Sequence, residues 1–229
     1  MPLRFLVMGC GAVGGIVAAH LLECGQDVAV YSSNAAIAEA VGARGFQLRG
    51  EGTARAVPAR VARQVPPGPF DVVVLATQPG HVVAAAQSAL ASLAPDGVML
   101  CLQNGLCEER VARVAGPART VGAVVAWGAA MPEPGLYDRT AAGGFTLGRL
   151  DGSSDARLEE IGRVLECIGP TEITANLAAV DFLNGEVVER GRKHGLPTPI
   201  NARVRSLVWD VASHKRTPGL DLLRELGTS

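Results

Sequence analysis

The stretch "VMGCGAVGG", Val7–Gly15, decides the fold. Its glycines have G-x-G-x-x-G spacing, after an apolar run that predicts a strand and before a run that predicts a helix. In such a loop the first glycine permits a tight turn, the second lets the backbone approach a pyrophosphate, and the third lets helix and strand pack closely. The free N–H groups that begin the helix attract phosphate. The predicted cofactor-binding residues of this loop are Gly9, Gly11, Ala12, Val13 and Gly14. A glycine-rich turn without a ligand is the alternative.

The first half of the chain alternates short β-rich runs with helical runs. The strand candidates are "RFLVMG", "DVAVY", "DVVVLAT" and "VMLCLQ", and the helices between them run to about Cys24, around Ala35–Val41 and from His81 to Leu93. These strands lack clean polar alternation, as a parallel sheet that is covered on both faces requires. The pattern predicts an α/β fold with a Rossmann-type doubly wound sheet.

Two further segments contain strand candidates joined at glycines. Residues 45–61, "GFQLRGEGTARAVPARV", predict an antiparallel ribbon at the edge of the sheet, and Arg119–Leu150 predicts a meander that extends the same sheet. A helix from Ser154 to Ile168 and a short strand "TEIT" follow.

The pattern changes near residue 175, beyond which two helices are expected, at about 178–194 and 200–214. We therefore expect a dinucleotide-binding domain over residues 1–175 and a short helical C-terminal domain over residues 176–229.

Composition excludes several classes of protein. With 21 basic and 22 acidic residues the net charge is -1, which gives no electrostatic footprint for nucleic acid or an anionic membrane, and we expect neither partner. The five cysteines are odd in number and lack C-x-x-C or Cys/His spacing, so neither a disulfide framework nor a metal site is predicted.

The apolar run "FLVMGCGAVGGIVAAHLL", Phe5–Leu22, has the length of a membrane span or a signal peptide. Its central glycines and the lack of a basic segment in front of it fit a strand, turn and helix better. We expect a cytoplasmic protein.

The end of the second predicted strand bears on which dinucleotide binds. There an acidic side chain normally selects NAD by binding the 2′-hydroxyl of the adenosine ribose, but this chain has Ser32, Ser33 and Asn34. Because no carboxylate repels a 2′-phosphate and hydroxyl donors are present, the sequence favours NADP. Since no arginine lies in the turn itself, Arg44 or Arg49 would have to reach that phosphate; a loop that binds neither cofactor well is the alternative.

Several motifs in order resemble one family. They are "GCGAVGG", "VVVLATQ", "CLQNGL", the meander "VVAWGAAMPEPGLYDRTAAGGFTLG" and "VDFLNGEVVERGRKHGLPTP". Together, to about Val208, they resemble the ketopantoate reductase (2-dehydropantoate 2-reductase) family. The resemblance implies a Rossmann domain followed by an all-α domain, with NADPH in the cleft between them and a 2-oxo acid reduced at its keto group.

The resemblance also implies roles for two residues. Asn104 of "LQNGL" matches the asparagine that orients the substrate or the nicotinamide, and is the predicted catalytic residue. Gln78 stands near the cofactor, where the family usually has lysine. Without the surrounding motifs, Asn104-Gly105 could be only a turn at the end of a strand.

The chain departs from the family beyond "TANL", Thr174–Leu177. The helix with the family's proton-donating lysine and several further helices are missing, and no residue matches that lysine. Ala179 stands where the family has the glutamate that binds the pantoyl hydroxyl, whereas Asp181, Asn184 and Gly185 match the rest of that motif. A natural loss of these helices and an omission from the sequence would give the same junction.

The missing lysine leaves the proton donor open. A general acid contributes about a hundredfold to ten-thousandfold to such a reaction. His81 is a conceivable substitute, although an exposed residue at a helix start is the commoner interpretation. Lys193 and Lys215 are interpreted as solvated charges, and Trp127 as a core residue of the meander.

Two functional hypotheses follow. The first is an NADP-dependent oxidoreductase that reduces a small 2-oxo acid or a related carbonyl compound. The second is an NADP-binding but catalytically impaired or repurposed family member, either a binding module or a partner subunit. In both, the apolar stripe of the C-terminal helices must be covered by the first domain or by a second copy of the chain, and we favour a homodimer.

Overall fold

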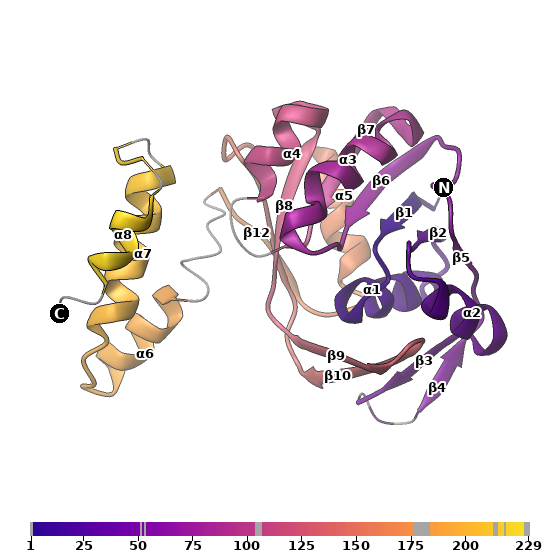
Figure 1. The fold of residues 1–229 in the computed structure, drawn as a ribbon, viewed down its shortest axis with the longest axis horizontal. Coiled ribbons are helices and arrows are strands. Elements are labelled where there is room, and N and C mark those ends of the chain that lie inside the picture. The colour runs from indigo at the N-terminus through magenta and orange to yellow at the C-terminus, as the bar shows by residue number, and fades with distance from the viewer. Residues whose placement is uncertain are drawn as a thin grey trace. The chain divides into compact units, whose positions relative to one another are not determined.

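The computed structural model describes residues 2–50, 52, 54–103, 107–175, 184–212, 215–217 and 219–226. The chain divides into two compact units, Met1–Leu177 and Ala178–Ser229. All strands among the described residues belong to the first unit, and the second unit contains three described helices (Figure 1).

The main sheet has eight strands in the order β12-β11-β8-β7-β6-β1-β2-β5. Their bounds are Arg4–Met8 (β1), Asp27–Tyr31 (β2), Val61–Ala62 (β5), Phe70–Leu75 (β6), Leu93–Cys101 (β7), Thr120–Val125 (β8), Phe145–Arg149 (β11) and Thr171–Ile173 (β12). From β5 to β8 every pair of neighbours is parallel, and β11 runs antiparallel to β8. The order β5-β2-β1-β6-β7-β8 is the 3-2-1-4-5-6 order of a Rossmann sheet, so the predicted fold class is confirmed.

Helices cover both faces of this sheet. One face packs against α1 (Ala12–Glu23), α2 (Ala35–Arg44) and α5 (Ala156–Leu165), and the other against α3 (Val82–Ala89) and α4 (Cys107–Ala115). Short 3₁₀ turns lie at Pro79–His81 (η1), Leu90–Ser92 (η2) and Pro117–Arg119 (η3). In β1, Phe5 and Val7 point into the first core and Leu6 and Met8 into the second, which explains why this strand is apolar throughout.

A second sheet has the order β4-β3-β10-β9. Its strands are β3 (Phe46–Arg49), β4 (Arg55–Val57), β9 (Gly128–Glu133) and β10 (Leu136–Ala141). The antiparallel ribbon of β3 and β4 is confirmed, but it does not lie at the edge of the main sheet, because β3 pairs in parallel with β10. The prediction that the whole meander extends the main sheet is therefore wrong for β9 and β10, and correct for β8 and β11.

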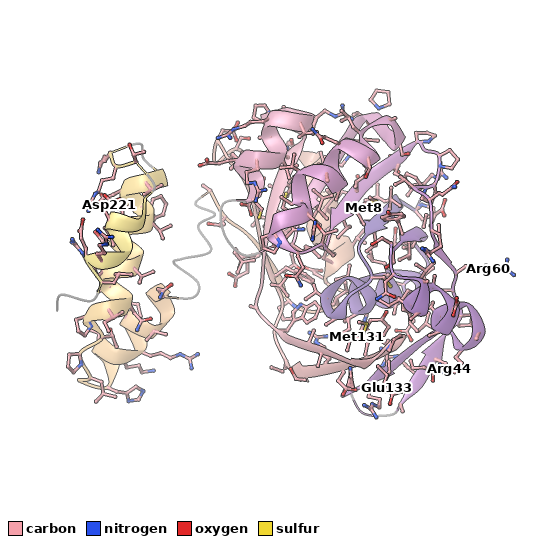
Figure 2. All side chains as sticks on the ribbon, viewed as in Figure 1. Met8, Arg44, Arg60, Met131, Glu133 and Asp221 are labelled. Carbon is pink, nitrogen blue, oxygen red and sulfur yellow. The ribbon has the colours of Figure 1, made fainter. Side chains whose placement is uncertain are left out.

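The physical reason for the second sheet is the composition of α1. All eight consecutive residues from Gly14 to Leu21 are buried, so this helix has no polar face to expose to solvent. The main sheet covers one side of α1, and β3, β4, β9 and β10 contact it as well. Figure 2 shows Met131 of β9 pointing toward α1. The apolar run at the N-terminus thus forms a strand, turn and helix, as predicted.

The second unit contains α6 (Glu186–Lys193), α7 (Pro199–Ala212) and α8 (Leu220–Arg224). Arg203 and Arg216 both pair with Glu225, and Leu207 and Leu222 are buried. The two predicted helices are present in the described residues, although the predicted start of the first, at about residue 178, lies outside them. The third helix was not predicted. No helix in the described parts of either unit has the length and hydropathy to cross a bilayer.

Candidate dinucleotide-binding site

Two glycines of the β1–α1 turn are required by packing within the protein. Gly9 has a φ of 104°, and a Cβ atom there would lie 2.9 Å from the carbonyl oxygen of Ala76. A Cβ atom on Gly14 would lie 2.0 Å from the carbonyl oxygen of Gly9. No side chain fits at either place without moving backbone atoms, so the turn can approach β6 and α1 can approach β1 only with glycine at these positions.

Gly11 is different, because a Cβ atom there would meet nothing within 4 Å. Its φ of -74° and ψ of -165° are open to any residue. The protein itself therefore gives no reason for glycine at this position. A ligand that comes close to the backbone, as a pyrophosphate does in G-x-G-x-x-G loops, would supply one.

The start of α1 offers unpaired donors beside this open space. The first bond of the helix runs from the Gly15 N–H to the Gly11 carbonyl at 2.8 Å, so the N–H groups of Ala12, Val13 and Gly14 have no acceptor within the helix. No acidic residue lies in the first turn, and no side chain caps it. The positive end of the helix dipole is thus uncompensated within the helix, which favours an anion.

The turn lies at the carboxyl ends of β1, β2 and β6. The Gly9 N–H donates to the Tyr31 carbonyl at 3.0 Å, and the Ala76 N–H donates to the Met8 carbonyl at 2.9 Å. The chain leaves β1 toward β2 on one side and returns at β6 on the other. Ligands of open α/β sheets bind at this kind of switch point.

Tyr137 of β10 supports the turn from the second sheet, a role that no sequence pattern indicated. Its hydroxyl donates to the Cys10 carbonyl oxygen at 3.1 Å and lies 3.3 Å from the Cys10 Sγ. Its ring lies where a Cβ atom on Gly15 would be, at 2.1 Å from Cε1. Burial raises the pKa of the Cys10 thiol to about 11, so it stays protonated at neutral pH. Cys10 and Tyr137 thus fix the turn as a neutral pair.

The residues after β2 divide into capping and free groups. Asn34 caps α2, because its Oδ1 accepts from the N–H groups of Ala36 at 3.0 Å and Ile37 at 3.4 Å. Ser32 is buried, and its Oγ accepts from the Asn34 N–H at 3.2 Å. Ser33 is exposed. Asn34 is exposed as well, but its side chain is used in capping, so Ser33 is the exposed residue of the three that does not cap α2.

The two arginines considered for a 2′-phosphate lie elsewhere. Arg49 is paired with Asp138 of the second sheet, with its Nε 2.7 Å from Oδ1 and its Nη2 3.1 Å from Oδ2. Arg44 lies in the last turn of α2, whereas Ser33 precedes the first turn of that helix. Figure 2 shows Arg44 beside the second sheet.

The loop after β6 contains Gln78, the residue in place of the family's usual lysine. Gln78 is exposed and precedes η1, and His81 is exposed at the start of α3. The buried Gln103 donates from Nε2 to the Thr77 carbonyl at 3.0 Å and so joins this loop to the end of β7. Its Oε1 has no hydrogen-bond partner among the described residues. Sequence reasoning passed over Gln103, although it stands directly before Asn104.

Asn104, the predicted catalytic residue, lies outside the described residues, as do Ala179 and Asp181 of the C-terminal motif. Asn184 of that motif donates from Nδ2 to the Asn201 Oδ1 at 3.0 Å, and so joins the start of α6 to α7. Gly185 is the N-cap of α6.

The described segment resumes at α4, where Glu108 is buried in the first turn. Desolvation raises the pKa of its carboxyl to about 7. Many functional sites contain a carboxyl group that changes charge near neutral pH. The position of Glu108 shortly after "QNGL" is the one feature of the sequence that points to such a group.

The remaining candidates agree with their interpretations from sequence. Lys193 and Lys215 are both exposed, in the second unit. Trp127 is buried in the core, with its ring edge-on to Phe145, and the Arg139 guanidinium lies 5.2 Å from the ring centroid. Among the described residues, no group of His, Cys, Asp and Glu side chains is placed so that it could hold a metal ion.

Comparison with known proteins adds a family and several relatives. A family model described as "Ketopantoate reductase PanE/ApbA" matches residues 5–152. A 2-dehydropantoate 2-reductase of Pyrococcus horikoshii is 27% identical over 177 residues, which cover 76% of this chain and 57% of that protein. One from Mesorhizobium japonicum is 27% identical over 231 residues, which cover 90% of this chain and 62% of that protein. The chain thus spans less than two thirds of the length of these relatives.

Solved structures have the same fold. The crystal structure of 2-dehydropantoate 2-reductase from Geobacter metallireducens has a TM-score of 0.73 at 25% identity, and the match covers 83% of this chain and 64% of that one. A complex of D-mandelate dehydrogenase with NADH has a TM-score of 0.68 at 15% identity, over 93% of this chain and 99% of that one. The second likeness concerns the fold alone.

Proposed function

The chain belongs to the ketopantoate reductase PanE/ApbA family of oxidoreductases, and from this premise we propose that it is an NADP-dependent reductase of a small 2-oxo acid or a related carbonyl compound. The observation that carries the proposal is the contrast within the glycine turn. Gly9 and Gly14 are required by packing, whereas the space at Gly11 is open beside unpaired helix N–H groups. This arrangement suits the pyrophosphate of a dinucleotide.

The residues present fit such a cofactor. The main-chain groups of the glycine turn would hold the pyrophosphate, and the hydroxyls after β2 would hold the adenosine ribose. The loop after β6 and the end of β7 would hold the rest of the dinucleotide. The proposed cofactor-binding residues are Gly9, Gly11, Ala12, Val13, Gly14, Ser32, Ser33, Gln78 and Asn104. The lack of a carboxylate in the turn after β2 supports NADP over NAD. When bound, the reduced nicotinamide supplies a hydride.

The proposed catalytic residue is Asn104, which would orient the carbonyl group of the substrate. The alkoxide that forms on hydride transfer must receive a proton, and no lysine precedes residue 193. Because a general acid contributes about a hundredfold to ten-thousandfold, we expect turnover well below that of a reductase with a positioned lysine. His81, three residues after Gln78 and exposed at the start of α3, is an ionisable side chain that could take part.

We also propose that the active form is a homodimer in the cytoplasm, with residues 1–175 as the dinucleotide-binding domain and residues 176–229 as a short helical domain. The helical unit exposes large apolar side chains at Val187, Leu196 and Ile200. A second copy of the chain could cover them. The five free cysteines suit a reducing compartment. Light scattering at micromolar concentration tests the dimer, and a monomer would count against it.

The experiment that tests the proposed function has two stages. The purified protein is titrated with NADPH while the fluorescence of the reduced nicotinamide is followed, and then mixed with NADPH and a panel of 2-oxo acids that includes 2-dehydropantoate. Binding followed by oxidation of NADPH with one of these acids supports the reductase. Binding without oxidation in the whole panel supports the impaired or repurposed family member, and lack of binding overturns both. The intact mass, compared with 23.6 kDa, confirms which chain was tested.

A further inference from the structure

The two-residue strand β5 brings an arginine to the end of β2. The strands are parallel, with Val30 opposite Val61 and Tyr31 opposite Ala62. The ladder continues one step beyond the strands, because the Ser32 N–H donates to the Ala62 carbonyl at 3.1 Å. The next residue along β5 is Arg63. It therefore leaves the carboxyl edge of the sheet beside Ser32 and Ser33.

The charge of Arg63 is not used elsewhere in the described parts of the chain. Arg63 is exposed, and it has no hydrogen bond or ion pair with any described residue. Two other arginines of this half of the chain already form ion pairs, Arg49 with Asp138 and Arg55 with Glu23. Arg63 thus adds a free positive charge to an edge whose turn, residues 32–34, contains no carboxylate.

We propose that Arg63 determines the preference for NADP by binding the 2′-phosphate of the adenosine ribose. In a Rossmann sheet the ribose hydroxyls lie at the carboxyl end of the second strand, where β2 ends here. A guanidinium group beside that end can donate two parallel hydrogen bonds to phosphate oxygens, with the exposed Ser33 hydroxyl as a further donor. The inference rests on the proposed function, because it concerns the cofactor of the same site. It differs from the expectation for Arg44 or Arg49, since the cation comes from the neighbouring strand.

The same strand provides a matched control. Arg60 precedes β5 at its amino end, whereas Arg63 follows it at its carboxyl end. Figure 2 shows the Arg60 side chain at the rim of the first unit, pointing outward. Replacing either arginine with alanine removes one positive charge from an exposed position, so the two variants have the same net charge and would share any general electrostatic effect. Only Arg63→Ala should act on the 2′-phosphate.

The test is a calorimetric titration of NADPH and NADH into the wild-type protein, Arg63→Ala, Arg63→Glu and Arg60→Ala. We expect the wild type to bind NADPH more tightly than NADH. Arg63→Ala should weaken NADPH binding about 10- to 100-fold, the usual effect of losing a charged hydrogen-bond partner, and leave NADH binding unchanged. Arg63→Glu should reverse the preference, because its carboxylate repels the phosphate, and Arg60→Ala should resemble the wild type.

Two further measurements make the result decisive. Thermal unfolding of each variant shows that the fold is retained, and titration with 2′-AMP and 5′-AMP isolates the phosphate position from the nicotinamide. If Arg63→Ala leaves the ratio of NADPH to NADH affinity unchanged, the role of Arg63 is overturned while the proposed function stands, since the wild type still binds. If the wild type binds neither dinucleotide, the proposed function fails and the role of Arg63 fails with it.

Discussion

The Tyr137 hydroxyl lies 3.1 Å from the carbonyl oxygen of Cys10, to which it donates a hydrogen bond across 127 positions of sequence. Through this contact, a strand of the second sheet holds the middle of the glycine turn, and the tyrosine ring also packs on Gly15 at the start of α1. The shape of the candidate cofactor site therefore depends on a part of the chain that contributes no residue to the glycine loop.

We expect Tyr137→Phe to lower the free energy of unfolding by about 1 kcal/mol, the usual net value of one hydrogen bond. NADPH binding should weaken several-fold, because the Cys10 carbonyl loses the hydrogen bond from Tyr137 that holds the glycine turn in place. Urea unfolding and an NADPH titration measure the two effects. Tyr31→Phe is the control, since the Tyr31 hydroxyl has no hydrogen bond within the described residues. Equal behaviour of the two variants would show that the contact does not hold the turn.

Gly11 and Gly14 should respond differently to alanine. Gly14→Ala should lower the midpoint of thermal unfolding strongly or prevent folding, because the new methyl group would lie 2.0 Å from the Gly9 carbonyl. Gly11→Ala should keep the wild-type midpoint, since its methyl group meets nothing within 4 Å, and yet lose most NADPH binding. Differential scanning fluorimetry and the fluorescence titration test both. A Gly11→Ala protein that binds NADPH as tightly as the wild type would falsify the placement of the pyrophosphate.

Glu108 should make the protein less stable as the pH rises from the acid range to about 7. Burial raises the pKa of its carboxyl to about 7 in the folded protein, so the folded state binds this proton more tightly than the unfolded state does. The stabilisation is complete below the unfolded pKa and is lost as the pH rises from that pKa to about 7, with a total on the order of 3 kcal/mol. Urea unfolding at several pH values should show this loss in the wild type and not in Glu108→Gln. A Glu109→Gln control should keep it.

The five cysteines should divide into two classes in thiol labelling. Cys10, Cys101 and Cys107 are buried, and burial raises the pKa of all three thiols, so they should react only on unfolding. Cys24 and Cys167 are exposed. The pKa of the Cys167 thiol is nevertheless raised to about 12, because the sulfur of Cys167 is partly buried and contacts Cys24. Labelling of Cys167 at neutral pH should therefore be slow and should accelerate as the pH increases. Peptide mass mapping after timed iodoacetamide treatment measures each site, and rapid labelling of Cys10 in the native protein would contradict the packing of the turn.

The parallel strands β1, β2, β6 and β7 and the helices α1, α2 and α3 followed from the sequence, because each strand and its helix are close neighbours along the chain; α4 was not predicted. The second sheet did not, since the pairing of Leu136 with Gln47 joins segments far apart in sequence, and an alternating strand looks the same in either sheet. The apolar composition of α1 predicted a strand, turn and helix rather than a membrane or signal segment, but it did not indicate a second sheet. It was in fact the mark of a helix that is covered by two sheets.

Within the candidate site, local motifs could be predicted and long-range contacts could not. The glycine spacing lies within nine consecutive residues, so the geometry of the turn follows from the local sequence. Arg63 lies beside Ser32 only because a strand of two residues pairs with β2, and so short a strand has no recognisable pattern. Tyr137 reaches Cys10 through the second sheet, and only the folded structure brings the two together.

The burial of α1 on every side has a consequence for its tolerance of substitution. A surface helix accepts polar residues at positions that recur every three to four residues, on the side that faces water. From Gly14 to Leu21 no such position exists. A saturation mutagenesis scan of this segment should therefore show an unbroken run of intolerant sites without a helical period, and charged labels or crosslinkers intended for this domain should be attached elsewhere.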